Sequence, residues 1–266
     1  MKTVLPILCF LAMSHAMLSA RERINLAEDD AAHSAYNGGW NNGGNAANSG
    51  FGGWQLVTSG ADKSDRHAGF IIARREAGNE LDHADIDRKA FGLYANGSGF
   101  ETAVAFRNLD NPLGVGESFS LLMEAGDFAP KTGSDDPKPG WVGFALRTGT
   151  ASASTEDIER AARFVFGVRQ GESRYFVRDG GKDTDTGVEA NGSGVAVTVT
   201  LVSADAYDLE ITALDTKVTK RFAGRRLAGP PGGPIESFAL CNQDGEKGDA
   251  YFNGFQVTRL VESLPR

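Results

Sequence analysis

The stretch at residues 35–56, AYNGGWNNGGNAANSGFGGWQL, marks where the strand-forming part of this chain begins. It places glycine and asparagine around three aromatic residues, Trp40, Phe51 and Trp54. Gly-Gly and Asn-Gly pairs permit the positive φ angles of tight turns, and aromatic rings supply either large buried area or a flat face for a ligand. We expect Phe51 and Trp54 to enter a hydrophobic core and Trp40 to remain exposed. The stretch is therefore predicted to open a β-sandwich.

After this stretch, apolar residues alternate with polar ones or form short runs that Gly, Asn, Asp and Pro separate. Alternation with a period of two is typical of half-buried strands. The pattern predicts strands at 54–58, 68–73, 90–95, 102–107, 118–125, 141–147, 163–169, 174–178, 195–202, 207–213, 217–222, 235–241 and 250–259. Their hairpin-like spacing predicts an all-β fold, in which two antiparallel sheets pack as a sandwich closed as a jelly roll.

The chain of 266 residues fits one large all-β domain at residues 36–262, because the proline-rich run at 229–234 is too short to link two domains. Glycine and phenylalanine, with 34 and 16 residues, are abundant, as is typical of strands joined by tight turns. Residues 154–162 begin with a helix-capping pattern, and residues 81–89 could hold a single helical turn. Residues 128–140 are too rich in Pro, Gly and Asp to form a strand.

Residues 1–20 have the features of a signal peptide. Lys2 supplies a positive start, a mainly apolar run follows, and small residues allow cleavage after Ala20 or after Ala16. The apolar run is short for a membrane span, with a retained anchor as the alternative. Residues 21–35 are charged and rich in alanine, so we expect a short helix or a polar spacer there. These features predict a secreted protein, periplasmic, extracellular or on the cell surface, with no membrane span after the leader is removed.

The net charge of −8 argues against general binding to nucleic acid or to an anionic membrane, because both would require a basic surface. Cys9 lies in the leader and Cys241 in the body, so the secreted chain would hold one cysteine and no internal disulfide. We expect Cys241 to be a buried strand residue. Asn96 and Asn191 fit the glycosylation pattern Asn-x-Ser, but Asn-Gly is also a hairpin turn signal, so both interpretations stay open.

Five motifs follow one another along the chain: FGGW at 51–54, AFGLYANGSG at 90–99, WVGFALR at 141–147, RFVFGV at 163–168 and GDAYFNGFQVTRL at 248–260. Their order resembles that of exported bacterial β-sandwich modules of the concanavalin-like, laminin-G-like type. The resemblance extends from about residue 36 to residue 260, and its motifs are mainly turns and core strands. It implies a concanavalin-like fold and, by analogy alone, an association with glycans or cell surfaces.

Strand alternation assigns residues to the two faces of each expected strand. The large apolar residues of 118–125, 141–147 and 163–169 share one face, which is the expected core face. The opposite faces carry small residues and arginines, and Arg107 is grouped there with Ala103 and Ala105, opposite the apolar Val104 and Phe106. If these strands are neighbours, they form a shallow basic floor, whose candidate ligand-binding residues are Arg107, Trp141, Arg147, Arg169, Tyr175 and Arg178.

Arginine binds carboxylate and sulfate groups through two parallel hydrogen bonds, and Trp141 or Tyr175 can stack on a sugar ring. These residues predict a non-catalytic module that binds carbohydrate, with an acidic or sulfated polysaccharide or a cell-surface glycan as the candidate ligand. The alternative is a solvated sheet face on which the arginines pair with Asp or Glu of neighbouring strands. The carbohydrate prediction requires Arg107, Trp141, Arg147 and Arg169 to share one face.

Catalysis has weaker support in the sequence. Glycoside hydrolysis needs two carboxylates around the scissile bond, and the Glu-x-Asp-x-Glu spacing of laminarinase-type sandwich enzymes does not occur. The nearest pattern, Asp208-x-Glu210, fits an exposed strand face better. His67 and His83 lie in an aspartate-rich region that is either a polar loop or a base or metal site. A polysaccharide lyase or hydrolase that uses the same face is the second hypothesis, and a structural cell-surface protein is the third.

A structural calcium ion is the one cofactor that the sequence suggests. Extracellular sandwiches often fix their loops with calcium, using Asp, Asn and backbone oxygens as ligands. Asp249 and Asn253, with Asp244 nearby, are the candidate ligands. A solvated acidic turn is the alternative.

Overall fold

The computed structural model describes residues 21–60, 67–76, 81–96, 100–125, 139–180, 182–243 and 248–262. These residues form fifteen strands, one short α-helix and one 3-10 turn. In chain order the elements are β1 (Arg21–Asp29), η1 (Ser34–Tyr36), β2 (Gln55–Ser59), β3 (Ala68–Arg74), β4 (Lys89–Ala95), β5 (Thr102–Asn108), β6 (Glu117–Ala125), β7 (Trp141–Arg147), α1 (Asp157–Arg160), β8 (Ala162–Arg169), β9 (Arg174–Asp179), β10 (Lys182–Glu189), β11 (Val195–Ser203), β12 (Ala206–Ala213), β13 (Thr219–Arg226), β14 (Ser237–Gln243) and β15 (Ala250–Glu262).

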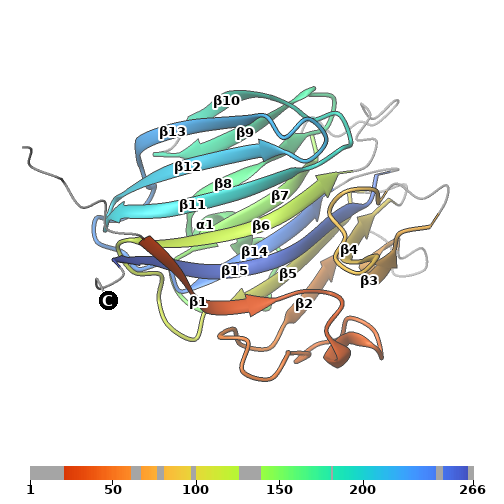
Figure 1. The fold of residues 1–266 in the computed structure, drawn as a ribbon. Helices are drawn as coiled ribbons and strands as arrows, with labels where there is room; N and C mark the ends of the chain where they lie inside the picture. The colour runs from red at the N-terminus through yellow and green to blue at the C-terminus, as the bar shows by residue number, and fades with distance from the viewer. Residues whose placement is uncertain are drawn as a thin grey trace, which may run out of the picture.

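The strands are arranged in two antiparallel sheets (Figure 1). Sheet 1 has the order β13-β12-β11-β6-β15-β4-β3, with β1 paired beside β15. Sheet 2 has the order β10-β9-β8-β7-β14-β5-β2. The predicted all-β fold of two packed antiparallel sheets is therefore confirmed. Within the described ranges, no helix is long and apolar enough to cross a membrane.

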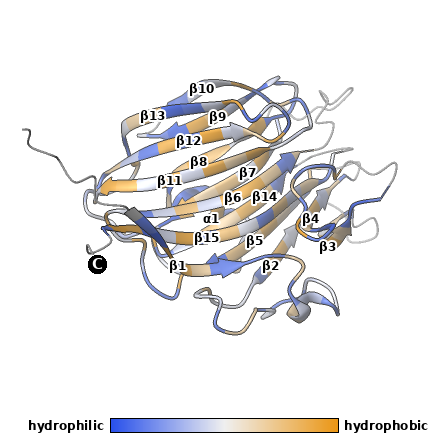
Figure 2. Cartoon of the chain, in the orientation of Figure 1, coloured by the Kyte–Doolittle hydropathy of each residue, from blue (hydrophilic) through white to orange (hydrophobic). Residues whose placement is uncertain are grey.

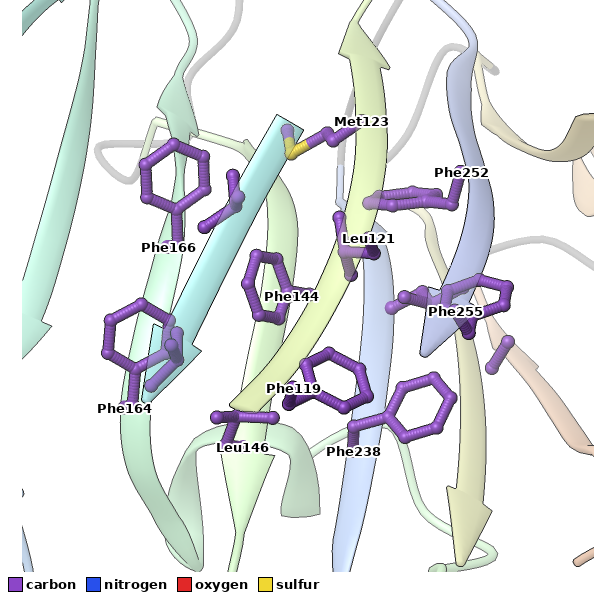
Figure 3. Packing of buried hydrophobic residues seen from close by; sticks show 14 of the residues in the cluster. Phe119, Leu121, Met123, Phe144, Leu146, Phe164, Phe166, Phe238, Phe252 and Phe255 are labelled. Carbon is purple, nitrogen blue, oxygen red and sulfur yellow. The ribbon is translucent and has the colours of Figure 1, made fainter. Parts of the chain in front are cut away.

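The main core lies between the two sheets, where large apolar side chains from both interleave (Figure 3). The strand alternation predicted these side chains correctly, and they are almost fully buried: Phe119, Leu121 and Met123 of β6, Phe144 and Leu146 of β7, and Phe164 and Phe166 of β8. Burying one such side chain contributes about 2–3 kcal/mol. Hydrophobic residues are concentrated on the central strands, whereas the edge strands β10 and β13 are largely hydrophilic (Figure 2).

The glycine-rich stretch before β2 closes one end of this core. Trp54 and Phe51 are buried as predicted, but the prediction that Trp40 stays exposed is wrong, because Trp40 is only 4% exposed. Its ring packs edge-on against Trp54, with 5.1 Å between centroids, and against Phe91 at 4.8 Å. Gly39, with φ of +102°, provides the turn that directs the indole inward.

Residues 21–29 form the strand β1 and not the expected helix or spacer. Its backbone pairs with the C-terminal strand β15, from Arg21 opposite Glu262 to Asp29 opposite Phe255. Ala27 and Asp29 are buried while most of β1 is exposed, so pairing with a distant strand, and not local composition, decides this conformation. β10 was also missing from the predicted strands, because its sequence KDTDTGVE has few apolar residues.

The outer face of sheet 2 carries a second, smaller core. Val104 and Phe106 belong to this outer cluster, whereas Ala103 and Ala105 face the main core, which is the reverse of the predicted assignment. Both faces of β5 are buried, so side-chain size alone does not distinguish them. Cys241 is buried in β14 within the outer cluster, as predicted.

Candidate functional site

Arg107 does not lie on the outer face of sheet 2. Its side chain is fully buried and pairs with the carboxylate of Asp29 at 2.7 Å. Its Nε donates to the Gly52 carbonyl at 2.8 Å, and its guanidinium lies 4.6 Å from the centre of a Trp54 ring. The prediction that Arg107 helps to form an exposed floor is therefore wrong, because Asp29 of the unexpected strand β1 supplies an internal counter-ion.

Tyr175 is likewise an interior residue. It is 1% exposed, and its ring stacks on Phe166 with 5.1 Å between centroids. Burial raises the pKa of its hydroxyl far above the usual value. Tyr175 is thus unable to stack on a sugar, and the prediction of this role is corrected.

Trp141 and Arg147 lie on the predicted face but are covered. Both are 5% exposed or less. Trp141 packs in the outer cluster beside Phe176, with 6.3 Å between ring centroids. Arg147 lies against residues 148–161, the covering segment, which adds Ile158 to that cluster. Arg147 donates hydrogen bonds to the carbonyls of Thr150 at 3.3 Å and Asp157 at 3.0 Å. Burial lowers its pKa. Arg147 thus holds the covering segment in place, and the burial of both side chains leaves them inaccessible to a polymer.

The helix expected within that covering segment is shorter than the sequence indicated. Residues 154–162 contain only α1, a single turn. Residues 81–89 form bends and the start of β4, without a helix.

Arg169 and Arg178 are the two candidate residues that stay accessible, with side chains 20% and 30% exposed. They lie at the outer edge of sheet 2, where Phe176 faces Asp185 and Arg178 faces Asp183 across β9 and β10. The predicted alternation of Arg174, Phe176 and Arg178 against Tyr175 and Val177 is confirmed in β9.

Arg169, Arg174 and Phe176 border a groove of about 540 Å³, which we call the β8–β10 groove. Its lining comprises Arg169, Gly171, Glu172, Ser173, Arg174, Tyr175, Phe176, Asp183 and Asp185. The volume lies in the range typical of small-ligand sites. Phe176 is buried beneath it, with the Arg169 guanidinium 4.3 Å from the ring centre.

Arg169 and the neighbouring Arg178 each pair with two carboxylates. Arg169 contacts Asp183, and it lies 3.6 Å from Glu172. Arg178 pairs with Asp183 at 2.7 Å and Glu159 at 2.8 Å. The cross-strand pairing that was the alternative interpretation of this face is therefore what the structure contains.

Arg174, which sequence reasoning did not select, pairs with Asp185 at 3.3 Å and Glu189 at 2.9 Å. The pKa of Asp185 is lowered, first by the hydrogen bond from the backbone N–H of Gly187 and also by Arg174. The pKa of Arg174 is raised by its two carboxylate partners, Glu189 first and then Asp185. Both groups are charged at neutral pH. Recognising β10 as a strand would have placed Asp185 beside β9.

Asn253 does not offer an oxygen to a calcium ion. Its Oδ1 accepts hydrogen bonds from the backbone N–H groups of Ala31 at 2.9 Å and Gly254 at 3.0 Å, and its Nδ2 donates to the Lys89 carbonyl at 2.6 Å. These bonds use both lone pairs of the amide oxygen. The prediction that Asn253 binds calcium is corrected, because its side chain instead joins β15 to the loop after β1 and to the start of β4.

Asp249 lies beside the Tyr251 hydroxyl at 3.3 Å, and burial raises the pKa of its carboxyl group. Asp244 lies outside the described residues. In the part of the chain that is described, no group of three or more His, Cys, Asp or Glu residues is placed to hold a metal ion.

The aspartate-rich region around His83 is a docked loop. Glu124 of β6 accepts hydrogen bonds at 2.8 Å from the backbone N–H groups of Asp82, His83 and Ala84. The buried carboxylate thereby satisfies three donors of this loop. This arrangement supports the polar-loop interpretation of His83.

No protein-family model matches the chain, and no curated protein matches its sequence. Among solved structures, the legume lectin-like domain from Entamoeba histolytica is 9% identical with a TM-score of 0.41, covering 74% of this chain and 91% of that one. A carbohydrate esterase from the Shiga toxin-encoding bacteriophage phi24B is 12% identical with a TM-score of 0.44, covering 91% of this chain and 100% of that one. The Ca2+/Man3GlcNAc-bound exoplasmic domain of VIP36 is 9% identical with a TM-score of 0.41, covering 80% of this chain and 88% of that one.

Because the identities and TM-scores are low, the comparisons carry no argument about a ligand or an activity of this chain.

Proposed function

We propose that this chain is an exported, non-catalytic module that binds carbohydrate in the β8–β10 groove. The observation that supports this most directly is the groove itself, where Arg169, Arg174, Asp183 and Asp185 surround an accessible volume large enough for one or two sugar rings. Sugars present many hydroxyl groups, each a donor and an acceptor. Paired guanidinium and carboxylate groups offer both kinds of partner in charge-assisted hydrogen bonds.

This proposal replaces the site suggested by the sequence, because the structure does not meet the condition on which that site depended. The broad floor required Arg107, Trp141, Arg147 and Arg169 to share an exposed face, and Arg107 points into the core. The site that we propose is confined to the edge formed by β8, β9 and β10, and of the original accessible candidates it keeps Arg169 but not Arg178. It adds Arg174 and Asp185.

The state of Asp185 favours binding over a catalytic role for this carboxylate. A glycosidase needs one carboxyl group that stays protonated until it donates to the leaving oxygen, and such groups have a raised pKa. Asp185 has a lowered pKa, set first by the Gly187 N–H. An ionised carboxylate is suited to accept hydrogen bonds from hydroxyl groups, and unsuited to act as that acid.

Export is the second part of the proposal. It rests on the leader-like composition of residues 1–20. Cleavage after Ala20 would make Arg21, the first residue of β1, the new N-terminus. N-terminal sequencing of the protein recovered outside the cytoplasm tests this and distinguishes cleavage after Ala20 from cleavage after Ala16.

A glycan array probed with the mature protein, with and without a chelator, tests the binding proposal. We expect retention on a subset of polysaccharides. If no glycan, neutral or acidic, retains the protein in either condition, the carbohydrate proposal is wrong, and a structural cell-surface role becomes the better account.

A further inference from the structure

We infer that the β8–β10 groove prefers saccharides whose polar substituents are hydroxyl or amino groups alone, and that it disfavours saccharides that also carry sulfate or carboxylate. The inference rests on the proposed function, and it names the ligand class of the same site. This preference is the opposite of the sequence-based prediction, in which a row of arginines favoured an acidic or sulfated polysaccharide.

The side chains that line the groove carry more negative than positive charge. Two guanidinium groups, Arg169 and Arg174, line it together with three carboxylates, Glu172, Asp183 and Asp185, so two positive and three negative charges leave one net negative charge. A sulfate or uronate group entering this space would meet more negative than positive charge at short range.

The two arginines that line the groove are already paired with carboxylates. Arg174 lies between Asp185 and Glu189, and Arg169 contacts Asp183. An arginine that is to grip a sulfate through parallel hydrogen bonds must release its carboxylate partner. The released carboxylate would then stay unpaired beside the new anion, which disfavours the exchange.

The carboxylates are held where a ligand would meet them. Asp185 Oδ1 accepts the backbone N–H of Gly187 at 2.6 Å, while its Oδ2 faces Arg174 at 3.3 Å. A carboxylate has about four lone-pair sites, so each oxygen retains one for a further donor. Hydroxyl groups and protonated amines are donors of that kind, whereas sulfate and ionised carboxylate have no proton to give.

Matched pairs of polysaccharides that differ only in charged groups give the direct test. The probes are dextran and dextran sulfate, neutral galactan and carrageenan, and glucosamine oligosaccharides and their N-sulfated forms, each titrated into the mature protein at low and high salt. We expect the uncharged or amino member of a binding pair to bind at least tenfold more tightly than its sulfated counterpart. Binding of the uncharged member should change little with salt, because it involves no net charge.

Two substitutions make the test specific to this groove. The double variant Asp185→Asn with Glu189→Gln leaves Arg174 without a carboxylate partner, and both positions are more than half exposed, so the fold should persist. We expect this variant to bind the uncharged ligand about tenfold more weakly and to gain affinity for sulfated polymer of about the same factor. The control Asp215→Asn removes an exposed, turn-capping aspartate of the β12–β13 turn in sheet 1 and should change neither affinity.

The outcomes separate the inference from the function on which it rests. Tighter binding of the sulfated member by the unmodified protein, weakened by salt, would overturn the selectivity and leave carbohydrate binding in place. A double variant with unchanged preference would show that Asp185 and Glu189 do not set it. The absence of binding to every probe would overturn both proposals.

Discussion

Arg107 of β5 and Asp29 of β1 form an ion pair at 2.7 Å inside the sandwich, with both side chains fully buried. The Tyr36 hydroxyl also donates to Asp29, and desolvation by burial, opposed by Arg107, raises the pKa of that tyrosine to about 12. The pair joins the N-terminal strand to sheet 2, although β1 itself belongs to sheet 1. It therefore connects the two layers near one end of the sandwich.

Substitution Asp29→Asn should destabilise the protein strongly, because it leaves the buried charge of Arg107 without a counter-ion. Breaking one side of a buried pair costs about 3–5 kcal/mol. The free energy of unfolding, measured by urea denaturation, should fall by this amount. The double variant Asp29→Leu with Arg107→Met should lose less than Asp29→Asn alone, and an equal or larger loss would contradict the role assigned to the pair.

Trp40 should be shielded from solvent in the native protein, together with Trp54 and Trp141, since all three are buried. We expect fluorescence with a short emission wavelength and little quenching by iodide, followed by a red shift and full quenching in urea. A strongly quenched fraction in the native state that disappears in a Trp40→Phe variant would show that this indole is exposed.

Arg147 should control access to the thiol of Cys241 beneath residues 148–161. The substitution Arg147→Met removes the hydrogen bonds to the carbonyls of Thr150 and Asp157, which should cost about 2 kcal/mol and loosen the covering segment. Burial raises the pKa of the Cys241 thiol and hides it, so a thiol reagent should react slowly with the unmodified protein and faster with the variant.

Arg160→Gln is the matched control for this experiment. Arg160 lies in the same segment, but its side chain is 71% exposed and pairs with Asp157 at the surface. Its loss should leave the labelling rate of Cys241 unchanged. Equal acceleration in both variants would mean that the segment opens for reasons unrelated to Arg147.

Asp205 should contribute to stability above its ordinary pKa of 3.8 and lose that contribution in acid. The pKa of Asp205 is lowered, first by the hydrogen bond from Arg163 and next by the N–H of Gly232. Because the folded pKa is lower than the unfolded one, stability is present above 3.8 and declines as the pH falls through the folded value.

The variant Asp205→Asn isolates this effect. The difference in unfolding free energy between the unmodified protein and the variant should be largest near neutral pH and shrink below pH 3.8. Urea titrations at several pH values measure it. A difference that grows toward acid would contradict the assignment.

Much of the main core was predictable from the sequence, because alternation reports which residues share a face. Phe119, Phe144 and Phe164 all lie where their spacing put them. This information is local to each strand. The alternation therefore predicted a β-sandwich and most of its strands, but it did not predict the order of the strands within each sheet.

The errors came from contacts between distant segments. β1 is a strand because it pairs with β15, more than two hundred residues away, and its local composition gives no sign of this. Arg107 was placed on the wrong face because its counter-ion Asp29 belongs to that strand. The burial of Arg147 beneath residues 148–161 likewise depends on tertiary contacts that the alternation along one strand does not report.

The central claim is that the β8–β10 groove binds carbohydrate, and one titration tests it most directly. Arg174 and Glu189 are opposite residues on paired strands of sheet 2, just as Arg221 and Glu210 are on sheet 1, and both pairs are exposed. Arg174→Gln and Arg221→Gln therefore remove equivalent surface pairs from different sheets. Calorimetric titration of a glycan retained on the array should show about tenfold weaker binding for Arg174→Gln and unchanged binding for Arg221→Gln. Equal affinity of both variants and the unmodified protein would contradict the claim.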